Sequence, residues 1–170
     1  MKTYKILIPV FNDWESLSIL LNNIHALKIN NLARIKILII DDCSSETLNK
    51  KIEFDSFEDI EIIKNIKNIG HGKSIANGIN YLSKKNEFDY LIVMDGDGED
   101  RPEEIKELIL RSVDLPSVTI TANRIKRSES AFFKLSYHLH KILTLVLTGY
   151  SIKFGNFMCI PKKDLNLITS

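Results

Sequence analysis

The sequence predicts an α/β fold in three layers, a mostly parallel sheet with helices on both faces. Short apolar runs of strand length alternate with segments of helical periodicity from the start of the chain, which is the pattern of a parallel sheet. The run at 35–40 is apolar on both faces apart from Lys36, as a central strand under two layers should be. Polar clusters follow the strand-like runs, and in such sheets ligands bind beyond the carboxyl ends of the strands.

The elements are expected in a regular order along the chain. Asn12 or Asp13 can cap the first helix, and Pro9, which has no backbone N–H, should end the regular pairing of the first strand. The expected strands are 5–10, 35–40, 60–63, 90–94, 117–121 and a last one within 152–160. The expected helices are about 13–27, 73–84, 102–113 and 131–147, with a short one opened by Pro161.

Composition predicts one globular domain over residues 1–170. The 44% hydrophobic and 26% charged fractions are typical of such a domain, and a net charge of +1 argues against nucleic acid as a partner. Cys43 and Cys159 have no metal-like spacing and fit a reducing, cytoplasmic compartment. We expect no signal peptide and no spanning helix, because no apolar stretch reaches about 18–20 residues.

The most informative stretch is an acidic turn after the strand that ends at Met94. Carboxylates stand at Asp95, Asp97, Glu99 and Asp100, separated by glycines that allow tight turning. Crowded carboxylates repel one another unless a cation neutralises them, and hard oxygen ligands suit Mg²⁺ or Mn²⁺ shared with a phosphate-bearing substrate. The alternative is a solvated acidic turn. Similar polar clusters at the other strand ends favour a functional site.

Two further clusters leave their roles open. Asp41 or Asp42, at the end of the second strand, could accept hydrogen bonds from a ribose or a base, or could cap the segment after Ser44. The turn at 68–74 is not a phosphate-binding P-loop, because Lys67 stands where the first glycine is required. On this pattern alone, His71 is expected to make a local hydrogen bond.

Basic and apolar segments follow the fifth strand. Arg124 and Arg127 could hold a diphosphate or an anionic acceptor, whereas Lys126 is expected to be solvated. The helix at 131–147 is apolar over more than one stripe, which fits core packing or contact with a membrane surface or a lipid tail.

Four segments resemble family 2 inverting glycosyltransferases in their order and spacing. These segments are 9–13, 40–44, 68–71 and 94–104, and the resemblance covers about residues 5 to 160. Within that family the chain is most similar to the bacterial polyprenyl-phosphate and dolichyl-phosphate sugar transferases. The resemblance implies the Rossmann-like fold of nucleotide-diphospho-sugar transferases, with an Asp-X-Asp metal motif.

The resemblance also implies a nucleotide pocket and its members. Pro9, Phe11 and Asp13 would line it, and Asp41 or Asp42 would contact the base or the ribose.

The acidic turn and the arginines would handle the diphosphate in these relatives. Asp95, Asp97 and Glu99 would bind Mg²⁺ or Mn²⁺ and through it the donor. Asp97 and Arg124 would be the catalytic residues, and Arg127 would help Arg124 to bind phosphate.

The chain departs from the family pattern at several positions. Glu99 stands where glutamine is usual, and Arg101 replaces a proline. Segment 153–158 lacks an acidic residue and an arginine that relatives carry, which puts acceptor handling in question. Relatives often continue into membrane-anchoring helices, so either the chain is a short or trimmed form or its acceptor is different.

The predicted function is metal-dependent, inverting transfer of a sugar from a nucleotide-diphospho-sugar. A polyprenyl-phosphate acceptor is favoured over a cell-surface glycan, with a location in the cytoplasm at the inner face of the membrane. Peripheral membrane contact and a homo-oligomer are compatible with this prediction. One alternative, a sugar-phosphate nucleotidyltransferase, needs a glycine-rich basic loop where residues 11–15 are acidic. The other is a degenerate nucleotide-sugar-binding module.

Overall fold

The computed structural model describes residues 1–45, 59–122 and 156–169. The described strands form one mixed sheet in the order β3-β2-β1-β4-β6-β5. These strands are β1 (Thr3–Val10), β2 (Arg34–Asp41), β3 (Ile60–Lys64), β4 (Tyr90–Val93), β5 (Ile120–Thr121) and β6 (Met158–Pro161). The described helices are α1 (Trp14–Ala26), α2 (His71–Ser83), α3 (Glu104–Asp114) and α5 (Leu165–Thr169), with 3₁₀ turns at Ile29–Asn31 and Lys162–Asp164.

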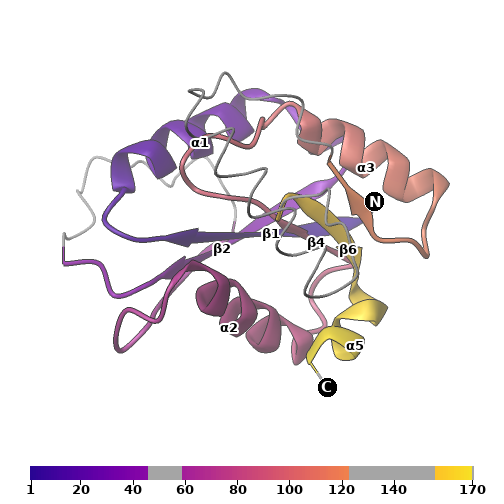
Figure 1. Cartoon of the computed structure of the whole chain (residues 1–170). Helices are drawn as coiled ribbons and strands as arrows, with labels where there is room; N and C mark the ends of the chain where they lie inside the picture. The colour runs from indigo at the N-terminus through magenta and orange to yellow at the C-terminus, as the bar shows by residue number, and fades with distance from the viewer. Residues whose placement is uncertain (46–58, 123–155, 170) are drawn as a thin grey trace, which may run out of the picture.

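Helices cover both faces of this sheet, so the predicted three-layer fold is confirmed (Figure 1). β1 alternates its side chains between two cores: Ile6 and Ile8 pack on the side of α1 and α3, whereas Leu7 packs on the side of α2 and α5. Strands β3, β2, β1 and β4 are parallel neighbours, so their carboxyl ends meet at one edge. The polar clusters expected at these ends are therefore neighbours in space.

Two strand predictions needed correction. Pro9 does not end the pairing of β1, because it lies opposite Ile40 inside the β1–β2 register and the strand continues to Val10. The strand expected at 117–121 shrinks to Ile120–Thr121, since Val118 donates its N–H to the Leu115 carbonyl in a turn instead of pairing.

The last strand is the main departure from a parallel sheet. β6 returns antiparallel between β4 and β5, pairing Cys159 with Ile92 on one side and with Ile120 on the other. Pro161 precedes a short helical turn, as predicted. The helix expected at 131–147 lies outside the described residues. Across the described ranges, no helix combines the length and apolar character that crossing a bilayer requires.

α2 packs unusually closely on the sheet. A Cβ at Gly78 would lie 2.5 Å from Leu7 Cδ1 and 3.2 Å from Ile40 Cγ1, whereas one at Gly72 would meet nothing within 4 Å. At the other end of the helix, Lys162 Nζ donates to the carbonyls of Leu82 and Ser83 at 3.1 and 2.8 Å. A glycine thus lets α2 pack closely on the sheet, and a lysine from the segment after β6 binds the last carbonyls of the helix.

Candidate functional site

A cavity of about 400 Å³ lies at the carboxyl ends of the neighbouring strands β1 and β4. It is lined by Pro9, Val10, Phe11, Asp13, His71, Asp95, Gly96 and Asp97. The Asp13 side chain also caps α1, accepting from the Ser16 N–H at 3.2 Å. An apolar and aromatic wall from β1 therefore faces carboxylates from the turn after β4.

The acidic turn is held in shape by its own carboxylates. Asp100 is buried, and its Oδ2 accepts from the Asp95 N–H at 2.8 Å. Asp97 Oδ1 accepts from the Glu99 N–H at 2.9 Å. A Cβ at Gly96 would lie 2.9 Å from the Pro9 carbonyl oxygen, so only glycine lets the turn approach β1 this closely. Asp100 is therefore a structural residue that orients the chain around Asp95.

Three side chains from distant parts of the sequence meet at Asp95. His71, the first residue of α2, places Nε2 3.1 Å from Asp95 Oδ1. Asn156, just before β6, places Nδ2 3.0 Å from His71 Nε2 and 3.4 Å from Asp95 Oδ1. The Asp95 side chain is 12% exposed and the His71 side chain 51% exposed, so the cluster spans the wall and the opening of the cavity.

Asp42 holds the turn that leads into α2. Its carboxylate accepts from the N–H groups of Ile69 and Gly70 and from the Asn65 amide, at 2.8–2.9 Å. Burial alone would raise the pKa of Asp42, but donors that include these three outweigh it and hold the pKa below its ordinary value. Gly70, at φ +89°, directly precedes His71, so Asp42 fixes the backbone from which His71 projects.

Asp41 and Asn12 join the loops after β2 and β1. Asp41 is buried; its Oδ1 accepts from the Ser44 N–H at 2.7 Å and its Oδ2 lies 3.5 Å from Lys64 Nζ. Asn12 Oδ1 accepts from the Ser45 N–H at 2.8 Å, while Asp13 provides the helix cap. Asp41 thus orders the start of the loop after β2, whereas the segment that it could cap lies outside the described residues.

The structure brings together only part of the predicted site. The cavity lining includes the predicted residues Pro9, Phe11, Asp13, Asp95 and Asp97.

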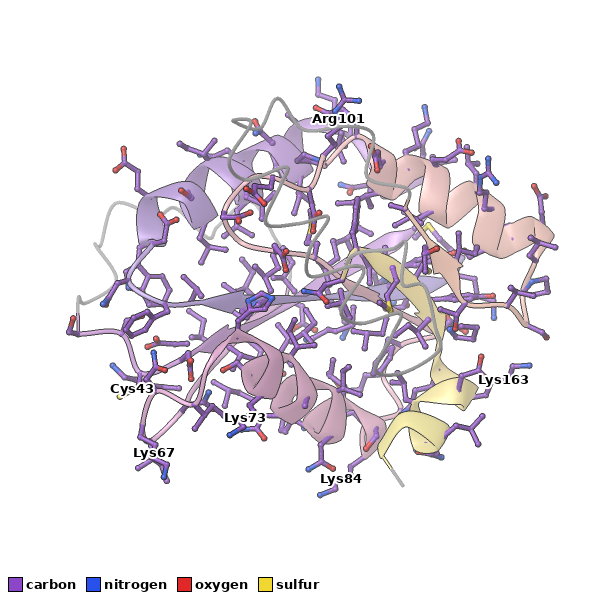
Figure 2. All side chains as sticks on the ribbon, viewed as in Figure 1. Cys43, Lys67, Lys73, Lys84, Arg101 and Lys163 are labelled. Atoms are coloured by element: carbon purple, nitrogen blue, oxygen red, sulfur yellow. The ribbon has the colours of Figure 1, made fainter. Side chains whose placement is uncertain are left out.

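Other residues named from the sequence lie outside this lining or outside the described residues. Asp41 and Asp42 are buried in the neighbouring loops, and Glu99 is exposed outside the lining. Arg101 is exposed and projects on the side of the sheet opposite α2 (Figure 2). Arg124 and Arg127 lie outside the described residues, as does Lys126.

Sequence reasoning missed His71 and Asn156 as members of this cluster. The glycines at 70 and 72 mark the turn that contains His71, and its position after the third strand is the signal that could have placed it beside the acidic turn. Nothing local marks Asn156, because its neighbours in space are brought to it by the return of β6 to the sheet.

The carboxylates fit a divalent cation in type and number. Within the part of the chain that is described, no three His, Cys, Asp or Glu side chains converge for a metal. Mg²⁺ in nucleotide sites is commonly held by one or two carboxylates together with substrate phosphates, and Asp95 and Asp97 line one cavity in this way. The hard oxygen donors therefore suit Mg²⁺ or Mn²⁺ shared with a diphosphate.

Comparison with protein families identifies the kind of domain to which this cavity belongs. The model of the family described as "Glycosyl transferase family 2" matches residues 5–166. The chain belongs to glycosyl transferase family 2. The matched range contains the described cavity and, apart from the first residues of β1, every described strand.

Curated relatives of this family 2 domain are longer proteins. An uncharacterized protein of Methanocaldococcus jannaschii is 26% identical over 155 residues, which are 89% of this chain and 65% of that protein. An undecaprenyl-phosphate 4-deoxy-4-formamido-L-arabinose transferase of Yersinia enterocolitica is 29% identical over 164 residues, 94% of this chain and 48% of that protein. The chain thus spans about half to two thirds of the length of these relatives.

Solved structures of glycosyltransferases share the fold. A mannosyltransferase of Pyrobaculum calidifontis in complex with GDP-Man and Mn²⁺ has a TM-score of 0.64 at 11% identity, covering 97% of this chain and 46% of that one. Glucosyl-3-phosphoglycerate synthase of Mycobacterium tuberculosis in complex with UDP has a TM-score of 0.65 at 11% identity, covering 95% and 57%. The predicted nucleotide-diphospho-sugar transferase fold is confirmed.

Proposed function

We propose that this family 2 domain is a metal-dependent, inverting glycosyltransferase that transfers a sugar from a nucleotide-diphospho-sugar to a polyprenyl phosphate. The observation that carries the proposal is the cavity at the carboxyl ends of β1 and β4. It joins an aromatic and apolar wall, which suits a nucleoside, to two aspartates, which suit a cation bound to a diphosphate.

The donor's nucleoside would lie against the end of β1. Pro9, Phe11 and Asp13 would line its site, with the half-exposed Phe11 ring offering a surface for the base. Asp41 is a better candidate than Asp42 for a contact with the base or ribose. The reason is that Asp42 already accepts three hydrogen bonds, whereas the Oδ2 of Asp41 has a longer contact with Lys64.

The diphosphate would lie at the acidic turn. Asp95 and Asp97 would hold the cation. Glu99 stays a predicted ligand, but it lies outside the cavity lining, and this position does not support the prediction. A bound divalent cation neutralises charge on the departing nucleoside diphosphate. Arg124, with Arg127, would bind the same diphosphate from the segment after β5, as the family resemblance implies.

The acceptor would be a lipid phosphate. Relatives that carry the name undecaprenyl-phosphate 4-deoxy-4-formamido-L-arabinose transferase support this choice. A phosphate oxygen is already an anionic nucleophile, so it can attack the anomeric carbon without a protein base. Attack on the face opposite the departing diphosphate inverts the configuration at that carbon. A glycan hydroxyl would instead need a general base near the sugar.

Donor binding tests the proposal first. UDP-, GDP- and dTDP-sugars are titrated by calorimetry with and without Mn²⁺, and we expect one of them to bind only with the metal. Asp97→Ala should abolish that metal-dependent binding, whereas Asp114→Ala, at an exposed end of α3, should not change it. Unchanged affinity in Asp97→Ala would overturn the metal assignment.

Turnover then separates an enzyme from a binding module. The donor that binds is incubated with a short-chain polyprenyl phosphate or with a glycan acceptor, and the product's anomeric configuration is read by NMR. Arg124→Ala should lower transfer more than nucleoside binding. Donor binding without transfer to either acceptor would favour the degenerate module.

A further inference from the structure

The contacts among His71, Asp95 and Asn156 form a closed triangle of polar atoms. His71 Nε2 lies 3.1 Å from Asp95 Oδ1 and 3.0 Å from Asn156 Nδ2, and the third side of the triangle is 3.4 Å. These residues come from α2, from the turn after β4 and from the segment that leads into β6. Three separate segments thus aim one polar atom each at the same small volume beside the cavity.

While Asp95 is an ionised carboxylate, no placement of hydrogen atoms on His71 and Asn156 satisfies all three contacts at once. If His71 Nε2 carries a proton, it donates to Asp95 but cannot accept from the Asn156 amide. If Nε2 carries none, it accepts from Asn156, but then its lone pair faces the Asp95 carboxylate oxygen at 3.1 Å. Rotating the Asn156 amide by 180° places its oxygen opposite Asp95 and leaves another repulsive pair.

A single cation removes this conflict, because all three positions can then be lone-pair donors. Metal–ligand distances of about 2.1 Å place neighbouring ligands of an octahedral ion about 3 Å apart, which is the spacing of this triangle. Resting on the metal-dependent function proposed above, we propose that His71 Nε2, Asp95 Oδ1 and the Asn156 amide oxygen form one face of the metal site. The diphosphate and Asp97 lie on the cavity side of that face.

This ligand set accounts for one property of the described chain and predicts another. Among the described residues, no three His, Cys, Asp or Glu side chains converge. The proposed set still supplies three donors to the metal, because its third donor is an amide oxygen. It also predicts a metal preference: because imidazole is a ligand that Mg²⁺ seldom takes, we expect the site to favour Mn²⁺ over Mg²⁺.

The neighbouring structure holds these donors in place. Asp42 fixes the backbone of Gly70 immediately before His71. Phe157, immediately after Asn156, is buried in the core between the sheet and α1 and α3. Both ligands are therefore attached to rigid points, as a preorganised metal site requires.

Metal binding by the whole chain tests the proposal without any transfer reaction. Mn²⁺ alone, and then Mn²⁺ with UDP, is titrated and followed by EPR, and pulsed EPR on protein labelled with ¹⁵N-histidine detects a nitrogen ligand. We expect a histidine nitrogen coupling in the wild type that is lost in His71→Ala, with Mn²⁺ binding weakened tenfold or more. His25→Ala, at an exposed position on α1, should leave both signals unchanged.

Substitutions at Asn156 distinguish ligation from hydrogen bonding. Asn156→Asp keeps an oxygen ligand and adds charge, so it should bind Mn²⁺ at least as tightly as the wild type, whereas Asn156→Leu should lose tenfold or more. If Asn156→Asp and Asn156→Leu weaken binding equally, or if Mn²⁺ binds the wild type with no histidine coupling, the ligand set is wrong while the metal-dependent function stands. Absence of Mn²⁺ binding to the wild type, with and without UDP, overturns both.

Discussion

Replacing Asp42 with asparagine should loosen the turn that carries His71 into the site. The carboxylate accepts from two backbone N–H groups and one amide, all at 2.8–2.9 Å, while being itself buried. Asparagine keeps one acceptor oxygen and places an NH₂ group against a backbone donor. The substitution therefore removes the charge, at least one hydrogen bond and the complementarity of another.

The size of the effect follows from these bonds. A hydrogen bond to a charged group contributes about 1.5–3 kcal/mol, so we expect Asp42→Asn to lower the free energy of unfolding by about 2–3 kcal/mol at pH 7. For a chain of this size that corresponds to a loss of roughly 4–12 °C in Tm. Asp114→Asn, at an exposed position, should change stability by less than about 0.5 kcal/mol.

The stability difference between wild type and Asp42→Asn should change with pH in one direction. The pKa of Asp42 is lowered in the folded protein, so its stabilising contribution is present above the unfolded value of about 3.9 and is lost as pH falls through the folded pKa. Urea unfolding of wild type and Asp42→Asn at pH 7 and near pH 3 should therefore show a difference that shrinks on acidification. A difference that stays constant, or that grows in acid, would refute this account of Asp42.

Substitutions at three other close contacts, one of them with a control, give further tests. Gly96→Ala places a Cβ 2.9 Å from a backbone oxygen of β1; it should cost about 1–3 kcal/mol in urea unfolding and weaken Mn²⁺ binding by displacing the acidic turn. Gly78→Ala should lower the free energy of unfolding by a similar amount, because the new Cβ clashes with Leu7. Gly72→Ala in the same helix should raise it by about 0.5–1 kcal/mol, since its Cβ meets no atom within 4 Å. Equal effects of the two substitutions would show that α2 does not pack on the sheet as described. Lys162→Met keeps the apolar stem but removes two bonds to the last carbonyls of α2, and should lower the free energy of unfolding by about 1–2 kcal/mol; an unchanged value would assign that lysine to solvent.

Most of the fold could be predicted because local patterns agree with it. The run at 35–40 reads as a central strand and becomes β2, and the apolar face of the first helix reaches the core through Leu17, Leu20 and Ile24. The prediction that Pro9 ends the pairing of the first strand was wrong. Proline lacks a backbone N–H, but this does not weaken the strand at a position that needs no donor. The direction and place of β6 are set by long-range pairing, which no local pattern encodes.

Without the family resemblance, which supplied Pro9, Phe11 and Asp13, the site was predictable only where its chemistry is concentrated in one turn. Asp95 and Asp97 stand together in the sequence and in the cavity, whereas Glu99 shares the turn but not the lining. His71 and Asn156 are 85 positions apart and single polar residues of their kind are common, so only the folded chain shows that they meet. The proposed site therefore depends on topology as much as on composition.

The antiparallel return of β6 has a consequence for synthesis on the ribosome. A nascent chain that has reached residue 122 contains β1 to β4 but not β6, which pairs with the edge of β4 that faces away from β1. An unpaired apolar strand edge favours association with other chains. Translation must add the residues up to 161 before that edge closes, a delay of several seconds at roughly 5–20 residues per second. Because Asn156 precedes β6, the same late step that protects the edge also brings the last member of the polar triangle to Asp95.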